Sequence, residues 1–258
     1  MKLSDNNIQF IKGIIIDSLR KKLKSYRPES KSMPFHYRLL GKDRMALYSF
    51  IQSLNTTFGT SIYEPVAVAL SKFKFKKATS QYVIGDKISE GAQSEIQDII
   101  NKLTIGNIQA KKDELERIRK VSQRGKTQSL KTVKVDLFLE SQDGSKYFID
   151  LKTAKPNIAQ FKDFKKTLLE WCAIELFKNP DAAVHSFIAI PYNPYEPQPY
   201  ERWTLKGMLD LDEELKVGAE FWDFLAGTGT YSQLLNCFEQ AGIELRPEID
   251  DYFKKFKE

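Results

Sequence analysis

The feature that most constrains this chain is a pair of apolar segments separated by a short turn sequence. Apolar residues occupy alternate positions along 131–140, and the segment 146–151 is apolar and aromatic. Between them, Ser141-Gln142-Asp143-Gly144 is composed of residues that are typical of a turn. Alternation with a period of two indicates strands, so the sequence predicts a β-hairpin at the centre of the fold.

Helical patterns surround this hairpin. Apolar residues recur at helical spacing in 6–26, 45–54, 61–73, 89–103, 111–121 and 157–178. Two further segments, 81–84 and 183–190, resemble strands, whereas 122–130 is predicted to be a flexible basic loop, 191–200 a rigid loop, and the remainder helical and acidic. The expected fold class is α/β, with a mixed sheet flanked by helices and additional N- and C-terminal helices.

Two acidic residues interrupt the apolar strands of the hairpin. Asp136 lies in the first strand, and Asp150 and Lys152 lie in the second. Because successive strand side chains alternate faces, Asp150 and Lys152 share a face, and Asp136 on the partner strand can approach them. Paired carboxylates favour a hard cation such as Mg²⁺, and a neighbouring ammonium group can stabilise phosphoryl charge. This combination is suited to hydrolysis of a phosphodiester.

The tripeptide Asp150-Leu151-Lys152 is not specific by itself. Glu29-Ser30-Lys31, Asp163-Phe164-Lys165 and Glu214-Leu215-Lys216 have the same acid-x-Lys pattern. The first lies in a proline-bounded linker, and the other two lie in predicted helices, where residues two apart diverge. A surface ion pair between Asp150 and Lys152 at a strand end is the alternative interpretation.

A third carboxylate is expected from a helix that precedes the hairpin. Glu64 is the first choice, because it lies among apolar residues at the start of the predicted helix 61–73. The alternative is an acid that interacts with the helix dipole in the first turn. Glu90 and Glu95, on the next predicted helix, are the other candidates.

The formal net charge is +6 at pH 7, and it is unevenly distributed. Residues 201–258 are acidic, whereas basic residues are concentrated in 111–134, as expected for a chain that contacts a polyanion. The candidates for DNA contact are Arg117, Arg119, Arg124, Lys155, Lys165, Tyr192 and Asn193. A solvated helical face and a rigid structural loop are the alternative interpretations of these segments.

Other sequence features restrict the class of protein. Cys172 and Cys237 are expected to be buried thiols, and with only His36 and His185 the chain lacks the clustered ligands that zinc sites require. The apolar runs are too short to span a membrane, and the N-terminus lacks the apolar core of a signal peptide. A cytoplasmic protein without a membrane partner is expected.

With these residues placed, the chain resembles the PD-(D/E)xK nuclease superfamily and, more closely, type II restriction endonucleases of the TdeIII family. The segments that carry the resemblance are Ser61-Ile62-Tyr63-Glu64, Lys134-Val135-Asp136-Leu137-Phe138, Asp150-Leu151-Lys152-Thr153, Lys155-Pro156-Asn157-Ile158, Phe161-Lys162-Asp163-Phe164-Lys165, Ile188-Ala189-Ile190-Pro191-Tyr192-Asn193-Pro194-Tyr195, Glu201-Arg202-Trp203 and Arg246-Pro247-Glu248-Ile249. They run through nearly the whole chain. One departure is that Val135 occupies the position of the superfamily's name-giving proline.

The resemblance implies a restriction-endonuclease-like fold in one domain over 1–258, with an N-terminal helical part at 1–57, a catalytic core at 58–192 and a C-terminal helical part at 193–258. It implies Mg²⁺-dependent cleavage of double-stranded DNA, with GGNCC as the suggested site, and a DNA methyltransferase as genetic partner. Cutting a palindrome favours a two-fold homodimer, with the acidic C-terminal helices as one interface that the sequence allows.

Two alternatives retain the same fold. A non-specific or repair nuclease would share every site residue, and a non-catalytic DNA-binding module would retain the basic surface. The fold alone does not separate these functions from a restriction enzyme.

Overall fold

A computed structural model describes residues 3–28, 33–152, 160–200 and 207–256. The chain divides into two compact units. One unit combines Met1–Val66 with Gly227–Glu258, and the other is continuous from Ala67 to Ala226. The continuous unit contains the hairpin, so it is described first.

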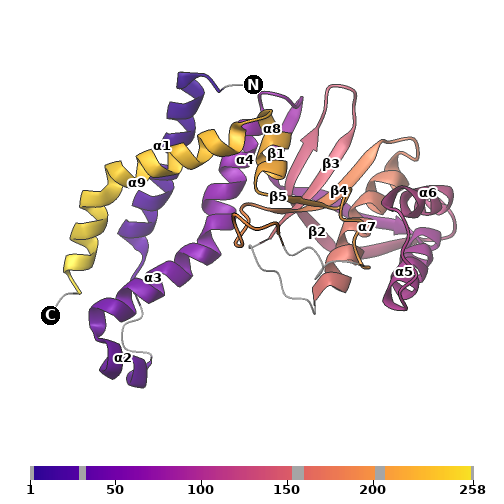
Figure 1. Ribbon diagram of the computed structural model, residues 1–258. Coiled ribbons are helices and arrows are strands. Elements are labelled where there is room, and N and C mark those ends of the chain that lie inside the picture. The colour runs from indigo at the N-terminus through magenta and orange to yellow at the C-terminus, as the bar shows by residue number, and fades with distance from the viewer. Residues whose placement is uncertain (1–2, 29–32, 153–159, 201–206, 257–258) are drawn as a thin grey trace. The chain divides into compact units, whose positions relative to one another are not determined.

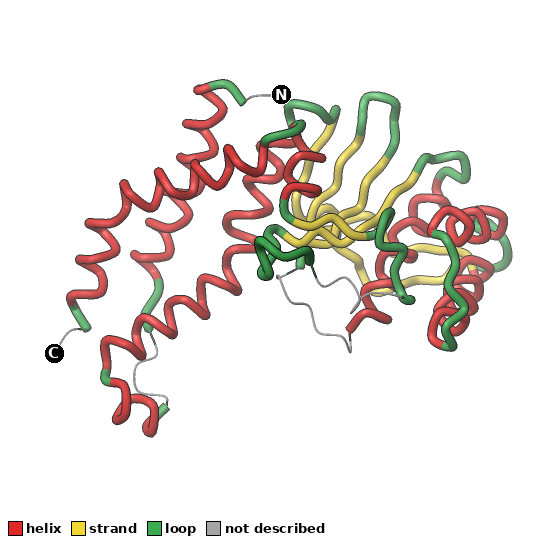
Figure 2. The backbone as a smooth tube through the Cα atoms, viewed as in Figure 1, coloured by secondary structure: helices red, strands yellow, loops and turns green. Residues whose placement is uncertain are grey.

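A mixed five-stranded sheet forms the centre of the continuous unit (Figure 2). Its strands are β1 (Lys77–Ser89), β2 (Thr127–Glu140), β3 (Lys146–Leu151), β4 (Val184–Ile190) and β5 (Leu215–Val217). They lie in the order β1-β2-β3-β4-β5, with antiparallel pairing from β1 to β3 and parallel pairing from β3 to β5. The predicted hairpin is β2–β3, and the predicted α/β fold with a mixed sheet is confirmed.

Helices cover both faces of this sheet. On one face, α7 (Phe161–Lys178) shares a core with β2 and β3, in which Phe138, Phe148 and Leu168 are buried. The helices α5 (Glu90–Thr104) and α6 (Lys111–Val121) lie beside α7 on that side (Figure 1). On the other face, Phe224 of α8 (Ala219–Ala226) packs with its ring centroid 5.3 Å from that of Tyr147. Because Tyr147 and Phe148 are adjacent in a strand, they point to opposite faces.

Local sequence explains where α5 begins and which side it buries. The Ser89 hydroxyl accepts a hydrogen bond of 3.0 Å from the Ala92 N–H group, which caps the first turn. Ile96, Ile99, Ile100 and Leu103 then form a buried stripe at helical spacing, whereas the opposite side remains polar. The predicted helix 89–103 is therefore confirmed.

The second unit is helical. It contains α1 (Asp5–Ser25), α2 (Pro34–Leu40), α3 (Lys42–Phe58), the π-helical turn η1 (Gly59–Tyr63) and α9 (Thr230–Lys254). Phe50 of α3 is at the centre of its core, with Leu23 of α1 and Tyr252 of α9. The helix α4 (Glu64–Ser71) crosses the boundary between the two units.

Several predicted boundaries are wrong. The segment 122–130 is not a loop throughout, because β2 begins at Thr127, and the strand predicted at 81–84 is β1, which covers Lys77–Ser89. β5 lies inside the C-terminal region that was expected to be helical. These residues gain strand structure by pairing with partners that are distant in sequence.

The expected parts 1–57, 58–192 and 193–258 also differ in extent from the two units, and a single domain over 1–258 stays a prediction. The predicted start of α7 at Asn157 lies outside the described residues. In the part of the chain that the structure describes, no helix is both long and apolar enough to cross a membrane.

Candidate active site

The β2–β3 hairpin brings Asp136 and Asp150 together. Leu137 pairs with Ile149 in the antiparallel register, so Asp136 faces Asp150 at the next position. The Asp136 carboxylate accepts a hydrogen bond of 3.0 Å at Oδ2 from the Leu151 N–H group. This bond holds Asp136 against the end of β3, where the second carboxylate is placed.

Lys152 completes this group. Its ammonium nitrogen lies 2.7 Å from Asp150 Oδ1 and 4.8 Å from the centroid of the Phe164 ring on α7. Its backbone N–H group donates to the Ala189 carbonyl of β4 at a distance of 3.0 Å. The lysine is therefore held between a carboxylate and an aromatic face, with 28% of its side chain exposed to solvent.

Burial controls the electrostatics of the site. Asp150 is only 5% exposed, and burial raises the pKa of its carboxyl to about 7. The Lys152 ammonium opposes this effect, whereas the negative charge of Asp136 raises the Asp150 pKa further. A divalent cation would stabilise the ionised form of the buried Asp150 carboxyl and would offset its repulsion by Asp136.

The side chains fit a hard divalent cation of the Mg²⁺ type. Asp136 and Asp150 offer carboxylate oxygens, and Mg²⁺ commonly uses one or two protein carboxylates together with water and substrate phosphate. The described residues contain no preformed group of three or more Asp, Glu, His or Cys side chains that could hold a metal. Two carboxylates leave the other coordination positions of such a cation to water and substrate phosphate.

The third carboxylate stays a prediction. Glu64 is the first residue of α4 and is buried, with 3% of its surface exposed, but the unit boundary passes through this helix. Glu90 is exposed, and its Oε2 atom accepts a hydrogen bond of 3.4 Å from the Lys126 N–H group. Glu95 forms an ion pair of 2.6 Å with Arg117. Glu90 and Glu95 thus have partners outside the carboxylate pair.

The three arginines proposed for DNA contact differ in their surroundings. Arg117 is held by Glu95 and Asp98, and Arg119 donates hydrogen bonds to the carbonyls of Pro180 and Ala182. Arg124 is exposed in the segment between α6 and β2. Existing partners restrict the first two guanidinium groups, so Arg124 remains the most accessible of these candidates.

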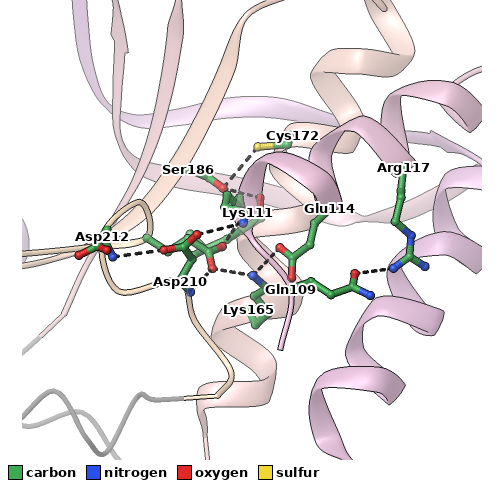
Figure 3. Close-up of polar contacts among 11 residues, drawn as sticks. Gln109, Lys111, Glu114, Arg117, Lys165, Cys172, Ser186, Asp210 and Asp212 are labelled. Carbon is green, nitrogen blue, oxygen red and sulfur yellow. Dashed lines mark hydrogen bonds and ion pairs between the residues drawn. The ribbon is translucent and has the colours of Figure 1, made fainter. Parts of the chain in front are cut away.

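Lys165 is not placed as the sequence interpretation expected. It is 0% exposed, and its ammonium group forms ion pairs with Glu114 of α6 (Figure 3) and with Glu214. Glu214 also pairs with Lys111. We call Lys111, Glu114, Lys165 and Glu214 the buried ion-pair cluster. A lysine enclosed in this cluster cannot reach a DNA phosphate, so its proposed contact is corrected.

The helical pattern contained a signal for this burial. Lys165 lies four residues after Phe161 and three before Leu168, both of which are buried on the apolar side of α7. A lysine at this position must find acidic partners in the interior, because an isolated buried charge is costly. What the pattern cannot show is which acidic residues supply them.

The remaining candidates lie in or near loops. Tyr192 is 44% exposed, which leaves its ring available for contact. The Asn193 side chain stabilises its own loop through two hydrogen bonds. Its amide nitrogen donates to the Gln198 carbonyl at 2.7 Å, and its amide oxygen accepts from the Tyr195 N–H group at 3.0 Å. Lys155 lies outside the described residues.

Comparison with known proteins places this site in context. The family model described as "Type II restriction endonuclease, HinfI" matches residues 3–242. The type II restriction enzyme HgiCII of Herpetosiphon aurantiacus is 27% identical over 221 residues, covering 84% of this chain and 80% of the relative. HgiEI of the same organism is 26% identical over 88% of this chain and 83% of its own length. MjaII of Methanocaldococcus jannaschii is 26% identical over 88% of this chain and 68% of its own length.

Proposed function

Because this chain belongs to the HinfI family of type II restriction endonucleases, we propose that it cuts double-stranded DNA with a Mg²⁺-dependent site formed by Asp136, Asp150 and Lys152. Family membership makes it a site-specific deoxyribonuclease that cleaves DNA in a sequence-specific manner. The identity of the catalytic residues, the metal and the recognised sequence are the parts that we propose.

One observation carries the assignment of the site. Asp136 and Asp150 face each other across the hairpin, and Lys152 Nζ lies 2.7 Å from Asp150. Both acids interrupt strands whose neighbours Val135, Leu137 and Ile149 are fully buried. A charged group in apolar surroundings lowers the stability of the fold unless it has a partner. Two carboxylates at these positions are therefore better explained by a function than by folding.

Each residue has a distinct role in the proposed reaction. Asp136 and Asp150 would hold Mg²⁺, which supplies Lewis-acid chemistry at a phosphoryl oxygen. Lys152 holds a positive charge beside the carboxylates, where it stabilises the negative charge that develops on the phosphate as the bond to water forms. Phe164 lies under the ammonium group and restricts its position. Glu64 is the proposed third carboxylate.

The finer assignments are also proposals. The resemblance to the TdeIII family and to the PD-(D/E)xK superfamily supports GGNCC as the recognised sequence and a DNA methyltransferase as genetic partner. A palindromic site would place two equivalent scissile bonds on opposite strands, so a two-fold homodimer with two active sites is the economical arrangement.

The proposal is tested by plasmid digestion with the purified full-length chain. We expect discrete fragments in the presence of Mg²⁺, none with a chelator, and none for Asp150→Ala. Asp163→Ala is the matched control, because Asp163 belongs to another acid-x-Lys tripeptide and is an exposed residue in the first turn of α7. This control should cut like the wild-type protein, and mapping the fragment ends identifies the recognised sequence.

The digestion pattern also separates the alternatives. A smear that needs Mg²⁺ and Asp150 would support a nuclease without sequence specificity. Intact plasmid under every condition, with DNA still retarded in a gel, would support a binding module. Fragments that persist in Asp150→Ala would contradict the assignment of the catalytic site.

A further inference from the structure

A polar groove of about 600 Å³ lies in the same unit as the candidate active site. It is lined by four elements, namely the end of β1, α5, the first part of β2 and the middle of α7. Nothing in the reaction described above uses this groove.

Two of these elements connect the groove to the catalytic residues. β2 contributes Leu130 to the groove and Asp136 to the active site, and α7 contributes Lys166 to the groove and Phe164 to the contact with Lys152. Leu130 precedes Asp136 by six residues, which corresponds to at most about 20 Å, because β2 bulges between Ser129 and Val133. Base pairs rise about 3.4 Å each, so this distance matches the length of a short recognition site.

Neutral amide side chains dominate one wall of the groove. Gln93, Gln97 and Asn101 are spaced four residues apart on α5, so they form a row on one side of the helix. Gln128 adds a further amide from β2. The Gln97 amide donates to the Asn101 oxygen at 2.8 Å, which orients both groups. Each amide carries donors and an acceptor, as the edges of base pairs do.

Glu90, at the start of α5, accepts a hydrogen bond from the Lys126 N–H group, and the other charged residues of the groove have ion-pair partners. Lys166 and Glu170 of α7 lie 3.7 Å apart, and Asp98 is paired with Arg117 and with Lys102. A surface that binds phosphate would instead carry an excess of positive charge. In the major groove, a lysine can donate hydrogen bonds to the acceptors of guanine. A glutamate can accept a hydrogen bond from the amino group of cytosine.

We propose that this groove is the base-reading surface of the enzyme, in which Gln93, Gln97, Gln128 and Lys166 contact base edges in the major groove of double-stranded DNA. The inference rests on the proposed function of the neighbouring catalytic site. It assigns sequence discrimination to residues that do not touch the scissile phosphate.

The test measures cleavage of short duplexes by the full-length protein. One duplex carries the site mapped by plasmid digestion, and others carry one substituted base pair. We expect Gln93→Ala combined with Gln97→Ala, and separately Lys166→Ala, to lower kcat/KM on the cognate duplex about 10- to 100-fold. Slow cleavage of the substituted duplexes should stay unchanged, so the ratio between cognate and substituted duplexes should fall. Gln9→Ala, an exposed glutamine on α1, is the matched control.

The outcomes separate the inference from the function on which it rests. Variants that retain the wild-type ratio within about twofold would overturn the groove as the base-reading surface, and so would an equal loss on all duplexes, which indicates damage to catalysis. A wild-type protein that cuts no duplex would contradict the proposed function itself. Thermal unfolding of each variant near the wild-type temperature would confirm that the groove remains folded.

Discussion

At the scale of single residues, the proposed function depends on charged side chains whose burial lowers the stability of the fold. Asp150 is enclosed by strands, and the ammonium of Lys152 is the cation that partly offsets its charge. Burial beside Asp136 raises the pKa of Asp150, and a divalent cation bound there would stabilise both carboxylates.

Replacing Lys152 with methionine should lower the single-turnover cleavage rate about 100- to 1000-fold, because the charge beside the reacting phosphate is lost. Lys162→Met is the control, since Lys162 is an exposed lysine on α7. Single-turnover assays at saturating Mg²⁺ measure the effect. Equal rates for the two variants would exclude a catalytic role for Lys152.

The Mg²⁺ requirement should depend on pH. Burial raises the pKa of the Asp150 carboxyl to about 7, so the metal-free site holds a proton below that pH and must release it when the cation binds. The Mg²⁺ concentration for half-maximal cleavage should therefore rise about tenfold per pH unit as the pH falls below 7, and become constant above it. Mg²⁺ titrations at pH 6, 7 and 8 measure this slope. A requirement that is independent of pH would contradict a proton on Asp150 that the cation must displace.

At the scale of elements, the buried ion-pair cluster joins helices to the sheet. Lys165 of α7 links Glu114 of α6 with Glu214, whose backbone carbonyl accepts a hydrogen bond of 3.0 Å from the Ile188 N–H group of β4. Ile188 in turn pairs with Asp150. The cluster is therefore attached to the strand next to the catalytic one, and its integrity should affect the position of the active site.

Lys165→Met should lower the free energy of unfolding by about 3–5 kcal/mol, because it leaves two buried carboxylates without their shared partner. Burial already raises the pKa of Glu114, so this carboxyl should take up a proton in the variant. Urea unfolding compared with Lys162→Met measures the difference. A loss below about 1 kcal/mol would mean that the cluster contributes little to stability.

At the scale of the whole molecule, the proposed palindromic site requires two active sites. We expect sedimentation equilibrium to yield twice the chain mass of 29.8 kDa, and we expect a plasmid with one site to be cut in both strands in a single binding event. A monomer that nicks one strand at a time would contradict the homodimer without affecting the assignment of Asp136 and Asp150.

The sequence by itself determined the hairpin and the approach of Asp136 to Asp150 and Lys152, because strand periodicity and turn chemistry are local properties. Only the tertiary structure decided which acidic residues surround Lys165, that Leu215–Val217 forms a strand, and that β1, α5, β2 and α7 line a polar groove. These features depend on partners far away in the chain, such as Glu114 and Glu214 for Lys165. Local sequence patterns limit the direction in which a side chain points, whereas long-range packing determines which residues it contacts.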